Sequence, residues 1–499
     1  MSRGRLPLPT LGILCAVLAG GCITVGPDYR PPPVPSLREW NAPLQGGLEA
    51  GAQELAQWWR LLGDPVLDDL IARALAGNTD VSRAMAAVRE ARARRTGAIA
   101  SLFPTADLST AYQRQKRASS SASGSGGSGG SGGSFDLFSA GFDAGWEIDL
   151  FGGVRRDIEQ RQGTLEAARA DLRSALVSVT AEVARNYVEL RSLQERIAIA
   201  IDNAESQAQT LQMTRWRFEA GLVGDLDVQQ ATYQLSETRA RIPTLESEMA
   251  QARHRLAVLL ALPAGSLDAG LSTEQPLPAA PARIAVGVPA DLLRRRPDVA
   301  AAERRLAAAT AAIGVATADL YPKLTLNGSL ELSATSVSGL DDEAARGYGI
   351  GPSVRWNLFD AGRIRAEIAA RSARADQALS DYEAAVLAAY EEGENALVAF
   401  AREQVRRDRL AHAVGAAREA ERLARTQYEN GVIDFQSVLE AQRARLGLEE
   451  SLAVSRATVT TNLVALYKAL GGGWQSDAPG SVIAATAGEE DPALSTRTE

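Results

Sequence analysis

The chain has 499 residues and a formal net charge of −8, and 45% of its residues are hydrophobic although only 5% are aromatic. The acidic balance argues against nucleic acid as a partner, because phosphate backbones bind clusters of Lys and Arg. So few aromatic residues favour closely packed helices with small aliphatic side chains over a thick aromatic core. The sequence contains no recognisable nucleophile and base set and no phosphate-binding loop, so we expect neither enzymatic activity nor a cofactor.

The N-terminus has the features of a secretory signal. Arg3 and Arg5 precede an apolar run over residues 11–19, and small residues follow directly before Cys22. This arrangement resembles a bacterial lipobox, in which the cysteine is acylated and the preceding peptide is removed. We therefore expect residues 1–21 to be a signal peptide and Cys22 to carry palmitate or a similar lipid. Loss of the two arginines takes the charge from −8 to −10.

The mature chain would keep a single cysteine. Cys15 lies within the signal, so no disulfide can form inside the mature chain. The alternative for Cys22 is an unmodified secreted thiol. Ile23 follows it where an aspartate would be needed for inner-membrane retention, and the resemblance to bacterial lipoproteins therefore implies the outer membrane.

Two tracts, beginning near Asp80 and Asp298, match each other in the order of their features. Each starts with a helical stretch that stops at an aromatic residue followed by proline, at Phe103-Pro104 and Tyr321-Pro322, because proline cannot continue a helix. Each then has alternating strands, a long helix, a turn with glycine and a further helix. We interpret the chain as a duplication in which each half contributes one hairpin and a set of helices.

Hydrophobic and polar residues alternate over about ten positions or more in the hairpins expected at 105–150 and 323–359. The apolar positions include Phe138, Phe142, Trp146, Leu324, Leu326, Leu330, Tyr348, Ile350, Val354 and Trp356. Strands of this length can cross a bilayer when tilted, and no later stretch offers the roughly 18 apolar residues that a membrane helix needs. A half-buried soluble sheet would also alternate, but it usually has shorter strands and lacks a signal peptide and apolar-face aromatic residues.

Four strands cannot close a membrane barrel, since the smallest have about eight. Two copies would give 8 strands and three would give 12, and only the wider barrel leaves an open lumen. We therefore expect a homotrimer. Residues 119–134, nearly all Ser and Gly, would form a flexible loop at the outer end of the first hairpin, or an engineered linker at that position.

A long helix is expected over residues 154–220, where only Gly163 interrupts the pattern, and its counterpart over 363–430. At about 1.5 Å per residue each spans about 100 Å. Small or apolar residues recur every three or four positions from Leu165 to Leu211, as in a coiled-coil seam.

Shorter helices are expected at 79–101 and 226–262, which together match the length of one long helix and could stack beside it. Pro243 predicts a kink in the second of them. The turns after the long helices contain Gly221 and Gly431, which permit the chain reversal at the end far from the membrane.

These features predict a modular order along the chain. The expected segments are a signal peptide (1–21), a lipid-anchored extended segment (22–63), a first repeat (64–263, with helices over 154–262), a linker (264–288), a second repeat (289–474, with helices over 363–470) and a disordered tail (475–499).

The chain resembles the outer-membrane efflux proteins of the TolC-like fold, in the lipoprotein branch that serves tripartite drug-efflux pumps. The resemblance is carried by Val25–Tyr29, Trp58-Trp59, Asp64-Pro65, Leu293–Val299, Leu358–Gly362 and both glycine turns, and it covers nearly everything from Cys22 to Trp474. It implies a mainly α-helical fold with transmembrane β-strands. The trimer would have a 12-stranded β-barrel, four strands per protomer, continuous with a 12-helix α-barrel and an equatorial mixed α/β belt.

The resemblance also implies partners and a gate. The partners would be a periplasmic membrane-fusion adaptor, an inner-membrane RND-type pump and outer-membrane lipid. The adaptor would contact the tip residues Gly221, Leu222, Val223, Gly431 and Val432. A polar gate at the periplasmic end would use Asp227, Tyr428 and Glu440.

Each gate position has a simpler interpretation. Asp227 could cap a helix, Tyr428 could pack at the tip, and Glu440 could lie on a solvated helix face. Ser437 and Gln427 are uncharged where relatives have charged residues, so the gate would have fewer charges.

Two other groups of residues have no predicted ligand. The arginines before Pro297 are expected at a helix start in the belt rather than in a phosphate site. His254 and His412 have no second ligand nearby, so no metal site is predicted.

The predicted function is passive conduction of drugs or other small toxic compounds from the periplasm or an inner-membrane pump to the exterior. The protein would be lipid-anchored in the outer membrane, with a long periplasmic part. Alternatives are an exit channel for type I protein secretion, metal-ion efflux, for which a chain with only 4 Met offers little support, and a structural coiled-coil lipoprotein without a pore.

Overall fold

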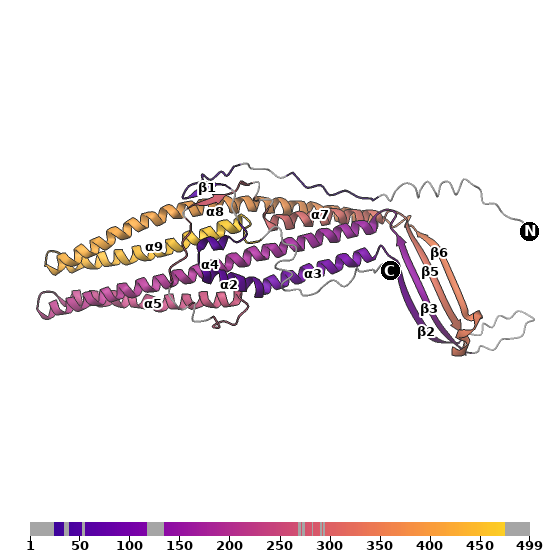
Figure 1. The fold of residues 1–499 in the computed structure, drawn as a ribbon, viewed down its shortest axis with the longest axis horizontal. Helices are drawn as coiled ribbons and strands as arrows, with labels where there is room; N and C mark the ends of the chain where they lie inside the picture. Colours follow the sequence, from indigo (N-terminus) through magenta and orange to yellow (C-terminus); the bar gives the residue numbers. More distant parts are fainter. Residues whose placement is uncertain are drawn as a thin grey trace, which may run out of the picture. The chain divides into compact units, whose positions relative to one another are not determined.

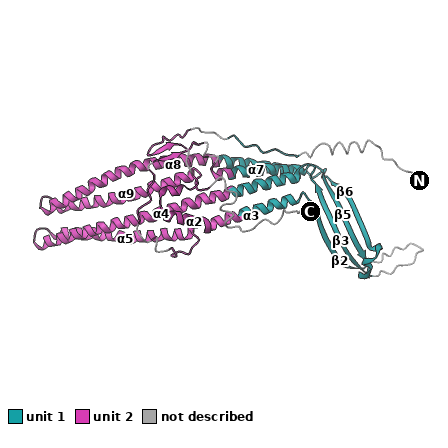
Figure 2. Cartoon of the chain, in the orientation of Figure 1, with its two compact units in different colours: residues 1–33, 87–169, 301–383 teal, residues 34–86, 170–300, 384–499 magenta. Residues whose placement is uncertain are grey.

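The structure is a computed structural model that describes residues 24–33, 39–51, 55–116, 134–267, 271, 275–281, 283–289, 292 and 295–474. The predicted signal peptide, the lipidation site Cys22, the Gly/Ser segment up to residue 133 and the tail from residue 475 lie outside the described residues. The chain forms two compact units, each of which takes residues from both halves of the duplicated sequence (Figure 2). Unit 1 comprises residues 1–33, 87–169 and 301–383, and unit 2 comprises residues 34–86, 170–300 and 384–499.

Unit 1 contains a four-stranded antiparallel sheet in the order β2-β3-β5-β6, so the two hairpins lie side by side (Figure 1). The strands are β2 (Thr105–Lys116), β3 (Ser134–Ile148), β5 (Lys323–Ala334) and β6 (Arg346–Arg355). The short 3-10 helices η3 (Val337–Asp341) and η4 (Glu343–Ala345) connect β5 to β6. The strands predicted from the alternating pattern are confirmed, with lengths of 10 to 15 residues.

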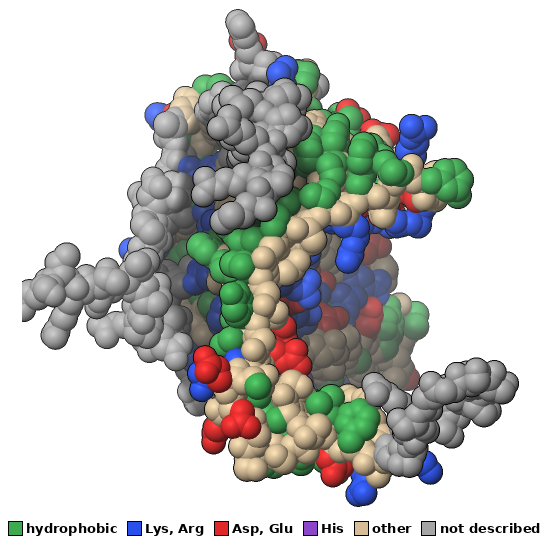
Figure 3. All heavy atoms as spheres, turned by 90° about the vertical axis from the view of Figure 1, so that its right-hand side faces the viewer, with side chains coloured by type: hydrophobic (Ala, Val, Ile, Leu, Met, Phe, Trp, Pro, Cys, Tyr) green, Lys and Arg blue, Asp and Glu red, His purple; other side chains and the backbone are tan. Residues whose placement is uncertain are grey.

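The register of this sheet separates apolar from polar side chains. Phe142 pairs with Leu108 on one side and Leu330 on the other. Its neighbour Asp143 pairs with Asp107, because successive residues of a strand point to opposite faces. Figure 3 shows hydrophobic side chains gathered along one side of the strand backbone. One face of the sheet is therefore apolar and the other polar.

The long helices are α4 (Gly153–Glu219) and α8 (Arg363–Glu429), which confirms both predicted helices to within a residue at each end. Each is followed by a second helix, α5 (Asp225–Leu259) or α9 (Phe435–Ala469), so each half forms a helical hairpin (Figure 1). Pro243 lies inside α5, which continues through it. Further helices among the described residues are α2 (Pro65–Gly77), α3 (Thr79–Ala100) and α7 (Pro297–Ala318). No helix in the described part of the chain combines the length and apolarity needed to cross a membrane.

Two equivalent tryptophans join the hairpin strands to the helices that precede them. Trp146 Nε1 donates to Leu102 O, just after α3, at 2.9 Å. Trp356 Nε1 donates to Leu320 O, just after α7, at 3.0 Å. Neither carbonyl can accept a hydrogen bond within the helix, because the helix ends before the following proline. The tryptophan supplies the missing donor.

Unit 2 contains a belt, which we define as the described residues among 39–77 and 275–298 together with the parts of α4, α8 and α9 on which they pack. Within it, η1 (Trp58–Leu62) places Trp58 on Tyr467 of α9, with ring centroids 5.1 Å apart and planes 12° from parallel. Both side chains are almost fully buried. Strands β1 (Leu48–Ala50) and β4 (Ile284–Val286) pair in parallel. The belt therefore has a large aromatic and aliphatic core.

A buried polar chain fixes α2 to α4 inside the belt. Asp64 caps α2 by accepting from the backbone amides of Val66 and Leu67, and its second oxygen accepts from the Tyr187 hydroxyl at 2.6 Å. Arg191 Nε in turn donates to that hydroxyl at 3.0 Å. Burial and the bond to Asp64 raise the pKa of Tyr187 well above its usual range. The phenol is therefore a permanent donor to the cap.

Candidate functional site

The two helical hairpins of unit 2 end in turns of the same geometry. Gly221 and Gly431 both have a φ of 71°, a left-handed conformation that glycine adopts without strain. The amide after each glycine donates to the carbonyl five residues before it, at 2.8 and 2.9 Å. This bond satisfies a carbonyl at the helix C-terminus. The predicted use of glycine for both reversals is confirmed.

Apolar side chains at these tips are open to solvent. Leu222 and Leu226 are both 68% exposed and Val432 is 70% exposed, while Val223 is partly buried. Exposed apolar side chains at the end of a helical hairpin suit contact with another protein. The adaptor contacts predicted for the tips, Gly221 and Gly431 included, stay a prediction with which this exposure is consistent.

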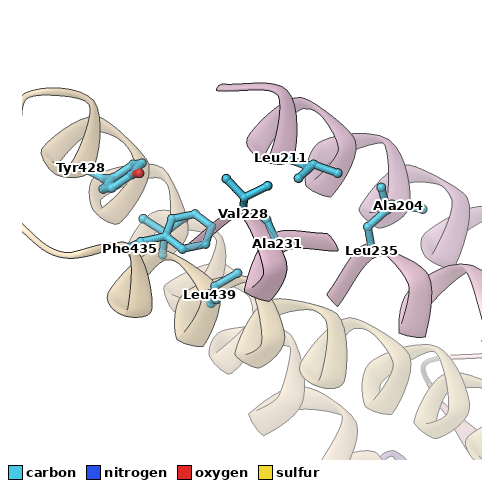
Figure 4. Close-up of a cluster of buried hydrophobic side chains, with 9 residues drawn as sticks. Ala204, Leu211, Val228, Ala231, Leu235, Tyr428, Phe435 and Leu439 are labelled. Carbon is cyan, nitrogen blue, oxygen red and sulfur yellow. The ribbon is translucent and has the colours of Figure 1, made fainter. Parts of the chain in front are cut away.

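Behind the tips, an apolar cluster joins the two hairpins (Figure 4). Its members come from α4, α5, α8 and α9 and are Ala204, Leu211, Val228, Ala231, Leu235, Tyr428, Phe435, Val438 and Leu439. The rings of Tyr428 and Phe435 lie 5.3 Å apart in a tilted arrangement. Because the burial of these groups stabilises contact between α4/α5 and α8/α9, the cluster opposes separation of the hairpins.

Tyr428 is also contacted by a cationic side chain of the other hairpin, Arg217. The guanidinium carbon of Arg217 lies 4.4 Å from the Tyr428 ring centroid, and its Nη1 donates to the Tyr428 carbonyl at 2.6 Å. Tyr428 is 4% exposed, and its hydroxyl makes no hydrogen bond within the described residues. Arg217, a basic residue in the last turn of α4, was missed by sequence reasoning, because its partner lies 211 positions later in the chain.

Asp227 lies in the first turn of α5, where its charge favours the helix N-terminus, and it is partly exposed. The interpretation of Asp227 as a helix cap is wrong, because Gly224 occupies the cap position. Since the Tyr428 hydroxyl has no partner in the described residues, it does not bond Asp227 within one protomer. The gate role of these two residues stays a prediction about contacts between protomers.

Glu440 lies on the exposed face of α9, where its carboxylate accepts from Gln436 Nε2 at 3.3 Å. Ser437, one turn before it, donates through its hydroxyl and its amide to Asp434 Oδ1, at 2.7 and 3.0 Å. These bonds, the hydroxyl first, hold the pKa of Asp434 below its usual value. Asp434 therefore caps α9, and Ser437 supports that cap.

In unit 1, the polar face of the sheet carries carboxylates and small side chains. A cavity of about 460 Å³ on this face is lined in part by Thr105, Asp107, Asp143, Asn327 and Ser329. Gly145, Gly349 and Gly351 also border it. Among the described residues, β2 and β6 each pair on one side only, so both outer edges of the sheet are available for pairing.

The segment that follows Cys22 is fixed to the body of unit 1. Arg156, whose side chain is 4% exposed, donates to Val25 O at 3.0 Å and to Gly26 O at 3.3 Å. A Cβ on Gly26 would lie 2.4 Å from the Cα of Gly314, so this approach requires glycine. Sequence reasoning singled out the segment but missed Arg156 and Gly314, which lie far from it in the chain.

Arg296 lies directly before α7 in the belt, which confirms the structural interpretation for this residue of the run, while Arg294 lies outside the described residues. Its guanidinium pairs with Asp298 at 2.5 Å and with Glu392 at 2.7 Å, and it donates to Ala469 O at 3.2 Å. Burial raises the pKa of Asp298, but the bonds to Arg296 and to the amide of Val299 outweigh burial and hold that pKa below its usual value.

Histidines and acids are not gathered for metal binding in the part of the chain that the structure describes. His254 and His412 are both exposed. No group of three or more His, Cys, Asp or Glu side chains there could hold a metal ion.

Comparison with known proteins agrees with this fold of strands and helical hairpins. The family described as outer membrane efflux protein matches residues 70–262 and 288–472. The chain is 32% identical over 443 residues to nodulation protein T of Rhizobium leguminosarum bv. trifolii, covering 88% of this chain and 91% of the relative. It is 32% identical over 456 residues to the pyoverdine export outer membrane protein OpmQ of Pseudomonas aeruginosa, covering 88% and 94%.

Solved structures show the same fold. The outer-membrane channel OprN superposes with a TM-score of 0.85 at 38% identity, over 90% of this chain and 99% of that one. The open state of the MtrE outer membrane channel of Neisseria gonorrhoeae superposes with a TM-score of 0.78 at 26% identity, over 91% and 99%. The predicted TolC-like fold is confirmed.

Proposed function

Because the chain belongs to the outer membrane efflux protein family, we propose that it is the outer-membrane channel of a tripartite efflux pump and conducts its cargo passively. The cargo is drugs or other small toxic compounds, delivered from the periplasm or from an inner-membrane pump of the RND type. Pyoverdine export, in the name of the relative OpmQ, is an example of small-molecule cargo.

The channel is a homotrimer closed by strand pairing between protomers. The observation that carries this proposal is the sheet of unit 1, with one apolar face, one polar face and two open edges. An open edge in a membrane leaves backbone groups unpaired, and pairing β2 of one protomer with β6 of the next removes both edges. Three copies form a 12-stranded barrel whose polar face lines the lumen.

The closed end lies at the helical tips. Asp227 and Tyr428 hold neighbouring helices together across the periplasmic entrance, and three copies of Glu440 form an acidic ring that favours cations. The exposed tips, with Leu222 and Val432 at their ends, contact the periplasmic adaptor. Acylation of Cys22 anchors each protomer to outer-membrane lipid.

Two measurements on the purified protein test the channel. Light scattering should give the mass of three chains, and single-channel recording in planar bilayers should show a small, cation-favouring current. Replacing Asp227 and Tyr428 with alanine should raise the conductance, because the contacts that narrow the entrance are removed. A monomer without conductance in both forms contradicts the channel and favours a structural lipoprotein.

Accumulation assays in cells would distinguish the classes of cargo. Loss of the protein should raise intracellular accumulation of organic pump substrates such as dyes in a strain without a redundant channel. Unchanged dye accumulation, with loss of a secreted protein or accumulation of a metal ion instead, identifies one of the alternative exit channels.

A further inference from the structure

Helix α4 buries different kinds of its own side chains along its length. Over residues 183–193 the buried positions are mainly apolar, and the buried Arg191 is bonded to Tyr187, Gln194 and Gln275. This stretch lies in the belt, and its polar groups are paired there. Such an interface resists both separation and the entry of water.

Nearer the tip, the same helix buries a row of uncharged polar residues. Asn203, Gln207, Thr210 and Thr214 are between 0% and 3% exposed. Their spacing of three and four places them on one face of α4. We call this row the polar seam.

The polar seam is only partly bonded to the other hairpin. Gln442 Nε2 of α9 donates to Thr210 Oγ1 at 2.9 Å, but Gln442 Oε1 has no partner among the described residues. Neither amide atom of Gln207 has a partner there. The hydroxyls of Thr210 and Thr214 donate to carbonyls of α4 itself, at 3.1 and 2.9 Å. Asn203 bonds α9 at one end of the seam, whereas Gln207, Thr210 and Thr214 donate no hydrogen bond to α9 within the described residues.

An ionic cluster marks the end of the polar seam nearest the belt. Arg445 of α9 bonds Glu421 of α8 at 2.9 Å and Asn203 of α4 at 2.6 Å. Glu449 accepts from Asn203 at 3.1 Å and from Arg418 at 2.7 Å. Both carboxylates are 7% exposed. Because charged groups at this depth need their partners, this cluster joins three helices firmly.

We propose that the polar seam is a sliding interface, which water enters when α8/α9 moves against α4/α5, with the ionic cluster as its fixed end. Separating an apolar interface exposes apolar surface to water, whereas separating this one gives the unpaired amides of Gln207 and Gln442 a solvent partner. The seam therefore opposes closure slightly and the apolar cluster at the tips favours it. This inference rests on the proposed function as a gated channel.

Apolar replacements of matched size test the seam by single-channel recording. Gln207→Met and the double variant Thr210→Val with Gln442→Met should open roughly tenfold less often than the wild type, the factor expected when an unpaired buried amide is removed from the closed state. Thr180→Val is the matched control, because Thr180 is a fully buried threonine of α4 that also donates to its own helix. Seam variants that open as often as this control overturn the proposal.

Amide hydrogen exchange tests the seam without requiring a current. In the wild type, residues 203–214 should exchange at least about tenfold faster than residues 183–193 of the same helix, and Gln207→Met should reduce the difference. Equal protection of the two stretches overturns the sliding interface even in a protein that conducts. Fast exchange at 203–214 in a protein that carries no current would instead support the seam and contradict the proposed channel.

Discussion

The belt and the tip region of unit 2 are made from the same helices, yet they are stabilised in different ways. In the belt, Trp58, Tyr187 and Tyr467 form a large buried core, and the Tyr187 hydroxyl is bonded to both Asp64 and Arg191. Near the tips, the two hairpins meet through a small apolar cluster and a polar seam in which Gln207 is unpaired. The comparison indicates that one helix can be rigid at one level and separable at another. The side chains that it buries, and not its length, decide which.

The largest expected effect concerns the belt core. Trp58→Ala should lower the free energy of unfolding by about 3–5 kcal/mol, because it removes a large side chain that is 1% exposed and stacked on Tyr467. Trp216→Ala is the control in the tip region, since that ring is 61% exposed and its loss should change stability by about 0.5 kcal/mol or less. Guanidinium unfolding of the detergent-solubilised protein measures both. Equal effects would remove the distinction between belt and tips.

The ionic cluster should give the next largest effect. Arg445→Met removes the 2.9 Å partner of Glu421 and a more distant cation from Glu449, and it should cost about 3 kcal/mol in unfolding free energy. Adding Glu421→Gln should recover part of this loss, because fewer unpaired charges remain buried. If the double variant is as unstable as the sum of two independent losses, the three residues do not act as one cluster.

A smaller effect is expected at the tips, where function and not stability should respond. Arg217→Gln removes the cation from the Tyr428 ring and should favour open states by about 1 kcal/mol, or about fivefold in opening frequency. Arg217→Lys should retain part of the closure. Single-channel recording would contradict this role of Arg217 if the glutamine variant opened less often than the wild type.

The smallest effect is a pH dependence in the belt. The pKa of Asp298 is lower in the folded chain than in the unfolded one, so its pairing with Arg296 stabilises the fold above the unfolded pKa and is lost as pH falls through the folded one. The stability difference between wild type and Asp298→Asn should therefore shrink as pH is lowered below about 4. Unfolding curves at a series of acidic pH values measure it, and a constant difference would count against the ion pair.

Local patterns in the sequence were sufficient to predict the strands, long helices and tips. The alternation through Phe142 and its neighbours fixed which side chains share a face, because the period of a strand is two. Gly221 and Gly431 indicated chain reversals because few other residues adopt positive φ. These features depend on residues close together in the chain.

Partners far apart in the chain could not be predicted in this way. Arg217 and Tyr428 meet across two hairpins, and Arg156 holds a segment more than a hundred residues before it. The pattern of apolar residues along α4 also did not predict that Gln207 and Thr210 are buried, because hydrophobic periodicity assigns polar residues to the surface. Burial of these groups depends on where α9 lies, which one helix alone does not reveal.

When the proposed channel opens, the tips should move apart while the belt keeps its dimensions. Spin labels placed singly at Val432→Cys in a tip and at Leu61→Cys in the belt, both exposed positions, would report distances between protomers of the proposed trimer. Pulsed electron spin resonance should show longer and broader distances at the tip label when Asp227 and Tyr428 are replaced by alanine, and unchanged distances at the belt label. Equal changes at both positions, or none at the tip, would contradict the account.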